Sequence, residues 1–309
     1  MSKVTIAIPT YNRPEYLPVV IKSILNQTFQ DFNIVIFDSG SNYDINKLVS
    51  SFNNPKIKLL TSDQIISSFT NFKRIFTYKY DTDYLVVFHD DDVMHPQMIE
   101  RELTVMENNK EIVWVGASLK FVHDESKMTD FKLLGKLQDV KLYNLQDLVR
   151  LIIGNFNLAF NTVMYRTTMI EYTDKLNEKY NKWADRPTLV CLSKKGKVAV
   201  TKEELVSYRV HRGQDSQIKS KNDLPYLLNL CNYYRDNLPI PLTSADKRLF
   251  YSWSTNNLIK TLAGFSDSFK EYKDLVMEFH DKGLIRFSYI NYRGIVYLLQ
   301  TLKKYLFAK

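Results

Sequence analysis

The chain has 309 residues, 45% of them hydrophobic and 25% charged, which is typical of a globular protein with a sizeable core. It contains only two cysteines, Cys191 and Cys231, so the composition excludes a disulfide framework and a cysteine-rich zinc site. The formal net charge of +8 favours acidic partners, and the stretch from residue 282 to 309 has six basic residues and no acidic one.

The first 122 residues alternate between short apolar runs and segments with helical spacing of apolar residues. This pattern predicts strands at 4–8, 33–37, 57–60, 84–88 and 112–121, and helices at 14–26, 68–80 and 96–108. Strands that alternate with helices form a mostly parallel sheet, and the right-handed crossover rule then places helices on both of its faces. We therefore expect an α/β fold with a Rossmann-like sheet.

After about residue 122 the pattern weakens. It predicts strands at 155–165, 197–200 and 205–210 and a helix at 185–194. From residue 223 onward the chain reads as helical, with helices near 223–235, 243–262, 266–280 and 293–307. We expect a helical C-terminal region after a boundary near residue 215.

No apolar run approaches the roughly 20 residues that a membrane-spanning helix needs. Residues 1–3 lead directly into the first predicted strand and leave no room for a signal peptide. We therefore expect a cytoplasmic protein.

Three consecutive carboxylates, Asp90, Asp91 and Asp92, follow the apolar run 84–88. Adjacent carboxylates repel one another, and a hard divalent cation such as Mg²⁺ or Mn²⁺ would relieve that repulsion. Ligands of open α/β sheets bind at the carboxyl ends of the strands, where these residues are expected. The alternative is a solvated acidic turn in which Asp92 caps a helix that has Pro96 near its start.

The loop after the first strand, residues 9–14, contains no glycine, which excludes a dinucleotide-binding turn and a phosphate-binding P-loop. It offers instead the hydroxyl of Thr10 and the ring of Tyr11, which either stacks on a base or packs within the loop. Asp38 ends the second strand and can accept a hydrogen bond from a base or a ribose. Its alternative role is to form the turn before Gly40.

Residues 4–13 and 24–29 resemble the opening of family 2 glycosyltransferases. The resemblance continues with the turn at 38–41 and with His89-Asp90-Asp91 at the place of the metal-binding D-x-D segment. It covers residues 3–110 in order and spacing, and residues 160–216 more weakly. It implies a GT-A fold, in which a nucleotide-binding half (1–110) and an acceptor half (111–215) form the catalytic domain, followed by the helical region 216–309.

The resemblance also implies the residues of the site. Asp91 and Asp92 would hold Mn²⁺ or Mg²⁺. The nucleotide-sugar donor would be contacted by Pro9, Thr10, Tyr11, Asp38, Asn71, Arg74, Asp90 and His211, the histidine reaching the diphosphate or the metal. Two positions depart from the family pattern: Ser39 stands where a second aspartate often contacts uracil, and His89 replaces the first aspartate of D-x-D.

Transfer with inversion needs a general base beside the acceptor hydroxyl. The resemblance places Asp185 in that role, whereas the local pattern, with Pro187 in the first turn of a helix, fits an ordinary helix cap. The processive-synthase segment Gln-x-x-Arg-Trp is absent, so we expect addition of a single sugar.

The implied reaction moves a sugar from a nucleoside diphosphate, UDP by preference, to a glycan or lipid-linked acceptor in bacterial surface polysaccharide synthesis. No nucleic-acid partner is expected. One alternative is a nucleotidyltransferase, which should carry a glycine-rich basic loop after the first strand; another is a non-catalytic glycan- or lipid-binding protein of the same fold. A phosphatase with Asp38 as nucleophile is disfavoured because Gly40 stands where its second aspartate is needed.

The last predicted helix is amphipathic, with apolar residues spaced along one face: Ile295, Leu298, Leu299, Leu302 and Leu306. Basic residues and tyrosines accompany it, a combination typical of a helix that lies on an anionic membrane. The alternative is that this face packs against the protein itself or mediates an oligomer through the C-terminal helices.

Overall fold

The computed structural model describes residues 2–137, 140–154, 156, 158–170, 174–211, 214 and 220–306. The chain forms two compact units. One, called here the sheet unit, comprises Met1–Asn144, Asn157–Asn177 and Thr188–Arg212; the other, the helical unit, comprises Leu145–Phe156, Glu178–Pro187 and Gly213–Lys309. The helical unit thus includes residues 145–156 and 178–187, which lie before the expected boundary near residue 215. The division into catalytic and C-terminal domains at that boundary stays a prediction.

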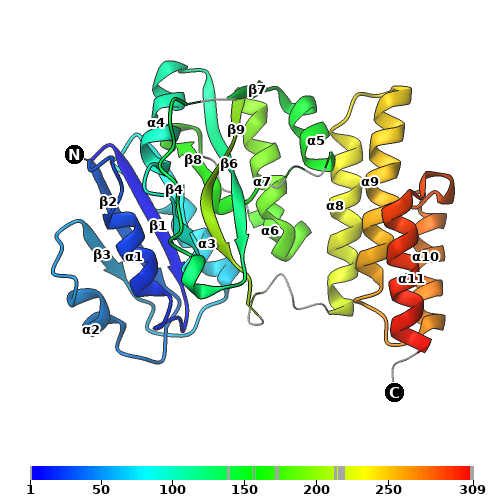
Figure 1. The fold of residues 1–309 in the computed structure, drawn as a ribbon, viewed down its shortest axis with the longest axis horizontal. Helices are drawn as coiled ribbons and strands as arrows, with labels where there is room; N and C mark the ends of the chain where they lie inside the picture. Colours follow the sequence, from blue (N-terminus) through cyan, green and yellow to red (C-terminus); the bar gives the residue numbers. More distant parts are fainter. Residues whose placement is uncertain are drawn as a thin grey trace. The chain divides into compact units, whose positions relative to one another are not determined.

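Among the described residues, nine strands of the sheet unit form one mixed sheet in the order β3-β2-β1-β4-β8-β6-β9-β5, with β7 also paired to β9. Four parallel strands form one half (Figure 1): β1 (Val4–Thr10), β2 (Phe32–Asp38), β3 (Ile57–Leu60) and β4 (Tyr84–Val87). β8 (Val163–Arg166) runs antiparallel between β4 and β6 (Ile112–Val122), and β9 (Lys197–Arg209) is parallel to β6. β5 (Val93–Met94) and β7 (Lys141–Tyr143) pair antiparallel with β9.

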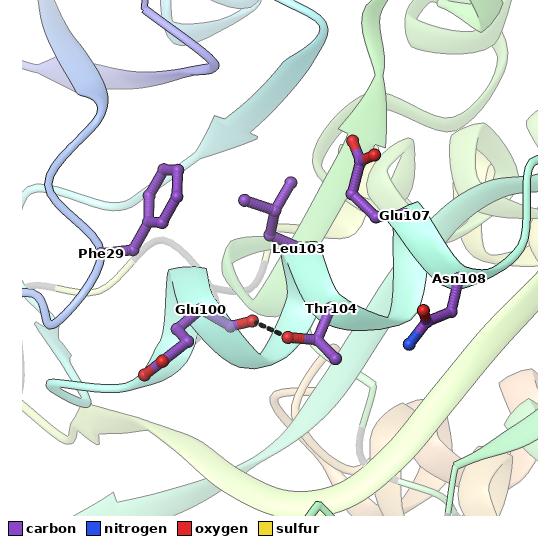
Figure 2. A pocket seen from close by; sticks show the side chains of 6 residues that line it. All are labelled: Phe29, Glu100, Leu103, Thr104, Glu107 and Asn108. Atoms are coloured by element: carbon purple, nitrogen blue, oxygen red, sulfur yellow. Dashed lines mark hydrogen bonds between the residues drawn. The ribbon is translucent and has the colours of Figure 1, made fainter.

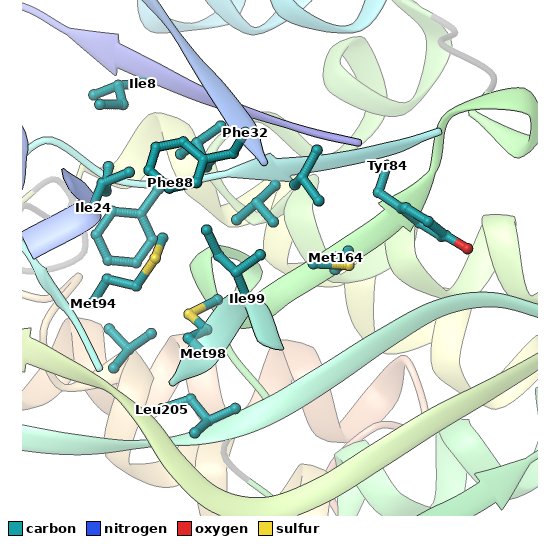
Figure 3. Close-up of a cluster of buried hydrophobic side chains, with 14 of the residues drawn as sticks. Ile8, Ile24, Phe32, Tyr84, Phe88, Met94, Met98, Ile99, Met164 and Leu205 are labelled. Atoms are coloured by element: carbon teal, nitrogen blue, oxygen red, sulfur yellow. The ribbon is translucent and has the colours of Figure 1, made fainter. Parts of the chain in front are cut away.

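Helices cover both faces of this sheet. Every second residue of β1, namely Val4, Ile6 and Ile8, belongs to a core cluster shared with α1 (Leu17–Leu25), α2 (Ile45–Ser50) and α4 (Met98–Asn108). Figure 3 shows side chains of this cluster, including Phe88 and Ile99. The alternate residues point to the opposite face, where α3 (Ser68–Thr77) contacts β1 and β2. The predicted α/β architecture, with helices on both faces of a mostly parallel sheet, is confirmed.

Pro9 ends the pairing between β1 and β4 at the carboxyl edge of this sheet. The Phe88 N–H donates to the Ala7 carbonyl at 2.9 Å, and the next bond in the ladder between β1 and β4 would need an N–H at Pro9. Proline has none, so the pairing ends there. β1 stays paired to β2 as far as Thr10 and Asp38, while the chain after Phe88 turns away and carries Asp90–Asp92 along this edge.

The helical unit is organised around α9 (Ser244–Leu262). Three helices pack against it: α5 (Leu145–Ile153), α10 (Phe269–Asp281) and α11 (Tyr292–Leu306). Arg150 of α5 donates to the buried Asp246 of α9 at 2.8 Å. Gly294 allows α11 to approach closely, since a Cβ at this position would lie 2.0 Å from Oδ1 of Asn256. The unit also contains α8 (Leu224–Asp236).

Two helices run across the boundary between the units, α6 (Asp174–Tyr180) and α7 (Asp185–Leu192). No helix in the part of the chain that the structure describes is both long and apolar enough to cross a lipid bilayer.

Every strand and helix predicted before residue 122 is present, with shifted ends. The prediction omitted the short elements α2, β5 and β7 and the helices α5 and α6. The strands expected at 197–200 and 205–210 are one strand, β9, whose polar middle stays paired to β6 through register shifts near Gly116 and Ser118. The strand expected at 155–165 is wrong in its first part, because residues 160–162 form a 3-10 turn before β8; Asn155 and Asn157 lie outside the described residues.

Glu102 of α4 is a carboxyl group buried in the sheet unit. Its side chain is 1% exposed, and neither carboxylate oxygen has a hydrogen-bond partner in the described structure. Burial raises its pKa well above the ordinary range, because an ionised carboxylate is poorly solvated there. The folded protein therefore keeps the protonated form of Glu102 to higher pH than the unfolded chain does.

We predict that Glu102→Gln stabilises the fold at pH 7 by about 1–3 kcal/mol, because it removes the cost of a buried ionisable group. A raised folded-state pKa lowers stability as pH rises above the unfolded pKa. The gain should therefore shrink toward pH 4, where the unfolded chain is protonated too. Thermal melting from pH 4 to 8 tests this, with Glu204→Gln on the exposed part of β9 as the matched control. An equal gain at every pH would contradict the assignment.

Candidate active site

A carboxylate and an imidazole meet where β4 and β9 end. Asp91 follows β4, His211 follows β9, and Oδ2 of Asp91 lies 3.0 Å from Nε2 of His211. Their side chains are 14% and 15% exposed, so both are accessible but largely enclosed. The ring of Tyr16, just before α1, lies 5.5 Å from the His211 ring. The fold thus brings together two site residues 120 positions apart in the sequence.

Asp92 is held by the protein on both of its carboxylate oxygens. It is fully buried; Oδ1 accepts the Arg209 N–H at 2.8 Å, and Oδ2 accepts from the Asn161 side chain and lies 3.4 Å from Nδ1 of His89. The interpretation of Asp92 as a helix cap is wrong, because α4 begins at Met98 with Gln97 as its N-cap residue. These contacts make Asp92 an anchor for the turn.

Three of these side chains are close enough to share one cation. His89, Asp91 and Asp92 each offer a ligand atom, and these atoms lie within 4.8 Å of one another. Carboxylate oxygens with an imidazole nitrogen are ligands that Mn²⁺ accepts. The residues present therefore fit a divalent ion, with His89, Asp91 and Asp92 as the possible ligands.

The clustered acids shift the ionisation of their neighbours. Burial opposes a charged imidazole, but the hydrogen bond to Asp92 and the charges of all three aspartates outweigh it and raise the pKa of His89 to about 9. Burial and the charge of Asp91 raise the pKa of Asp90 to about 6, against the opposing effect of Thr10, Arg13 and the Tyr11 N–H. The repulsion expected from three adjacent carboxylates is thus present in the folded protein.

The loop after β1 lies against the acidic turn. The Tyr11 N–H donates to Oδ2 of Asp90 at 3.3 Å, Thr10 is buried, and the Tyr11 side chain is 40% exposed. Pro9 is partly buried at the end of β1. Pro9, Thr10, Tyr11 and Asp90, which the sequence assigned to donor binding, therefore lie together at one edge of the sheet.

The other predicted donor-binding residues form a hydrogen-bonded group at the ends of β2 and β3. Asp38 accepts from the backbone of Gly40 and Ser41 at 3.2 and 3.1 Å and from the Ser41 hydroxyl at 2.6 Å, so it does form the turn. Asn71, buried on α3, donates to the Phe37 carbonyl at 2.7 Å. Arg74 donates to Asn71 at 3.1 Å and to the carbonyls of Asp38 and Leu60 at 2.9 and 3.0 Å. These bonds fix the turn; contact of the three residues with a donor stays a prediction.

The sequence analysis missed Arg209 and Asn161. Arg209 is 2% exposed; its Nε donates to the Asp91 carbonyl, its guanidinium pairs with Glu125, and it lies 4.4 Å from the centre of the Tyr16 ring. Asn161 comes from the 3-10 turn before β8. The sequence did contain a signal for Arg209: it lies two residues before His211 at the end of an apolar strand, where a buried charge needs a partner.

Asp185 is the first residue of α7 and belongs to the helical unit. Its Oδ1 accepts the N–H of Arg186 at 2.7 Å. Its charge acts on the buried Tyr234, whose pKa is raised mainly by burial. Its role as general base stays a prediction, since the two units are described separately.

A pocket on α4 is a separate feature. Figure 2 shows Phe29 facing α4 residues, and Thr104 donates to the Glu100 carbonyl at 2.7 Å. Glu107, which also lines the pocket, accepts from the hydroxyl of Tyr84, the first residue of β4. The acidic turn follows the last residue of β4, so this pocket lies away from the predicted site, and none of the site residues lines it.

The model of the family described as "Glycosyl transferase family 2" matches residues 5–172 of this sequence. The chain belongs to glycosyltransferase family 2. An uncharacterized glycosyltransferase of Haemophilus influenzae is 25% identical over 226 residues, covering 70% of this chain and 68% of that protein. One from Nostoc is 27% identical, covering 68% and 65%. The chondroitin synthase of Pasteurella multocida is 26% identical, covering 70% of this chain but only 21% of that enzyme.

Solved structures agree in fold. Residues 1–349 of S. aureus TarS, in complex with UDP-GlcNAc, match with a TM-score of 0.55 at 13% identity, covering 91% of this chain and 92% of that one. The mannosyltransferase PcManGT from Pyrobaculum calidifontis, in complex with GDP-Man and Mn²⁺, matches with a TM-score of 0.54 at 13% identity, covering 99% and 88%. The predicted GT-A fold is confirmed.

We predict that Asp91 and Asp92 differ in their effect on stability. Asp92→Ala leaves two buried donors, the Arg209 N–H and the Asn161 amide, and the partly exposed His89 without their acceptor, and should lower the free energy of unfolding by about 3 kcal/mol or more. Asp91→Ala removes a largely enclosed but accessible charge from a repulsive cluster and should change the free energy of unfolding by less than about 1 kcal/mol. Urea unfolding in EDTA measures both; equal losses would contradict the anchoring role of Asp92.

Proposed function

We propose that this protein is a metal-dependent inverting glycosyltransferase that moves one sugar from a nucleoside diphosphate to a hydroxyl of a glycan or lipid-linked acceptor. The observation that carries the proposal is the Asp91–His211 pair at the carboxyl edge of the sheet, beside the loop of Pro9 to Tyr11. Family membership favours this function over that of a nucleotidyltransferase.

The donor is proposed to bind along the edge formed by the ends of β1, β2 and β4. The exposed ring of Tyr11 is suited to pack beside a base. Asp38, which already accepts from Gly40 and Ser41, is proposed to lie beside the base at the end of β2. Asp90 lies next to Tyr11 and is proposed to accept from the ribose or the sugar. Asn71 and Arg74, which donate to the carbonyls of Phe37 and Asp38, are proposed to face the donor from α3. TarS with UDP-GlcNAc and PcManGT with GDP-Man support a nucleotide-sugar donor.

Asp91 and Asp92 are proposed to hold the divalent ion, with His89 close enough to contribute and His211 reaching the diphosphate or the metal. The ion would neutralise the charge that grows on the departing nucleoside diphosphate. The Mn²⁺ bound to PcManGT supports such an ion without deciding between Mn²⁺ and Mg²⁺. Arg209 keeps Asp91 in place through its carbonyl, and His211 can ligate through Nε2, the nitrogen that faces Asp91.

Asp185 is proposed as the general base. It would take the proton from the acceptor hydroxyl as that oxygen attacks the anomeric carbon from the face opposite the leaving group, so one displacement inverts the centre. The acceptor is proposed to be a growing surface glycan of a bacterium. The chondroitin synthase of Pasteurella multocida, a relative by sequence, supports a polysaccharide product.

Metal dependence is the first test. We predict that transfer, or slow hydrolysis of the nucleotide sugar, requires Mn²⁺ or Mg²⁺ and stops in EDTA. Asp91→Ala should lower turnover about 100-fold or more, as expected when a group that stabilises developing charge is lost. Asp63→Ala, which replaces an exposed acid of the sheet unit, is the control.

Thermal shifts with UDP-, GDP- and dTDP-sugars identify the donor, because binding to the native state raises the melting temperature. Full activity in EDTA would refute the metal dependence, whereas no thermal shift and no turnover with any donor would favour a non-catalytic protein.

The second test separates the two roles of Asp185. Asparagine stabilises a helix N-terminus as well as aspartate does but cannot accept the proton. Asp185→Asn should therefore keep the melting temperature while turnover falls about 100-fold or more. If the variant transfers sugar at the parent rate, Asp185 only stabilises the helix.

A further inference from the structure

The outer face of α11 carries an apolar stripe that packs against nothing in the described structure. The stripe consists of Tyr292, Ile295, Leu299 and Leu306, whose side chains are 80%, 50%, 61% and 74% exposed. At 3.6 residues per turn these four positions lie within about 60° of one another around the helix axis. Isolated exposed leucines are ordinary, but an aligned set along a whole helix indicates a contact surface.

The opposite face of α11 is the one that packs on the rest of the helical unit. Gly294 and Thr301 are buried there, with Gly294 against Asn256 of α9. The hydroxyl of Tyr305 hydrogen-bonds to Ser266 after α9, and Lys304 donates to the carbonyls of Ala263 and Ser266. The helix is therefore fixed by small and polar residues, and its apolar stripe faces away from α9. Of the five residues expected on one apolar face, Leu298 and Leu302 are only partly exposed, whereas Ile295, Leu299 and Leu306 belong to the stripe.

Basic residues flank the stripe on one side. Arg293 and Lys303 are exposed and, among the described residues, form no ion pair, whereas Lys304 is engaged at the end of α9. No acidic residue occurs from 282 to the end of the sequence. Three acidic residues of α10, Asp274, Glu278 and Asp281, lie on its face opposite the buried Tyr272 and Phe279, and the fourth, Glu271, pairs with Lys221. The ring of Tyr272 contacts Tyr305 of α11. The surface around the stripe is therefore both apolar and positively charged.

We propose that this face of α11 docks on an anionic lipid bilayer, with the stripe in the headgroup region and Arg293 and Lys303 against lipid phosphates. An aromatic residue, aliphatic residues and flanking cations are the combination that such helices use. A second copy of the chain fits less well, because a two-fold contact through the stripe would bring cations of both copies together without an acid to pair with them. The proposal does not depend on the glycosyltransferase reaction.

The test is flotation of the full chain with vesicles of phosphatidylcholine alone or mixed with phosphatidylglycerol. We expect binding only to the mixed vesicles. Arg293→Gln/Lys303→Gln should weaken partitioning about 25-fold, at roughly fivefold per basic residue. Lys270→Gln/Lys273→Gln, on the exposed side of α10, keeps the same net charge and should bind within about twofold of the parent if the α11 surface makes the contact.

Leu299→Lys separates insertion from charge. It raises the positive charge, so purely electrostatic adsorption predicts tighter binding. Loss of an inserted apolar side chain predicts binding about tenfold weaker. Met277→Lys, at a 40% exposed position of α10, is the matched control and should not weaken binding. Thermal melting confirms that each variant folds, which is expected because the positions are exposed.

Three results would overturn the proposal: no binding of the parent to acidic vesicles at low salt, tighter binding of Leu299→Lys, or equal losses in the α10 and α11 variants. Light scattering after size-exclusion chromatography tests the remaining possibility, that a second copy of the chain binds the stripe. A parent dimer that Leu299→Lys converts to a monomer would make the stripe an interface between copies, and it too would refute the membrane role. None of these measurements depends on turnover, so they stand apart from the tests of the reaction.

Discussion

The hydrogen bonding of the buried Asp92 is the constraint on which the candidate site depends. Its carboxylate joins three pieces of the sheet unit: the turn after β4, the 3-10 turn of Asn161 before β8, and Arg209 at the end of β9. A buried carboxylate without these donors would cost several kcal/mol, so the three ends stay together as long as the unit is folded. Arg209 extends the network to the Asp91 carbonyl. The accessible carboxylate of Asp91 is thus positioned by the hydrogen-bond network around the buried carboxylate of Asp92.

This arrangement separates two tasks that adjacent aspartates in a sequence do not distinguish. Asp92 fixes the backbone through its buried hydrogen bonds, and Asp91 presents its carboxylate to His211. Pro9 contributes by ending the ladder between β1 and β4, which leaves room for the turn at the edge of the sheet. Burial and the charge of Asp91 raise the pKa of Asp90 to about 6, and a cation at this position would relieve that repulsion.

The helical unit follows a different design. Its helices pack on α9 through the ion pair of Arg150 with the buried Asp246, a close approach at Gly294 and the tyrosines of α10 and α11. Most apolar side chains of α11 are therefore not needed inside. A sequence pattern shows that a helix has an apolar face but not which way the face points. Here the buried side is the one with glycine and threonine, and the leucine stripe remains available for a partner.

The sequence by itself determined the α/β class, the long strands and helices, and the group of Pro9, Thr10, Tyr11 and Asp90–Asp92, because apolar periodicity and short-range motifs are local properties. It did not determine the short elements β5 and β7 or the continuity of β9, since these exist through pairing with distant strands. Tertiary structure alone decided that Asp91 meets His211 and that Asp92 is an anchor rather than a cap. Those outcomes depend on which buried donors reach the same carboxylate. Arg209 and Asn161 do so from more than 60 residues away in the sequence, and no local pattern encodes that.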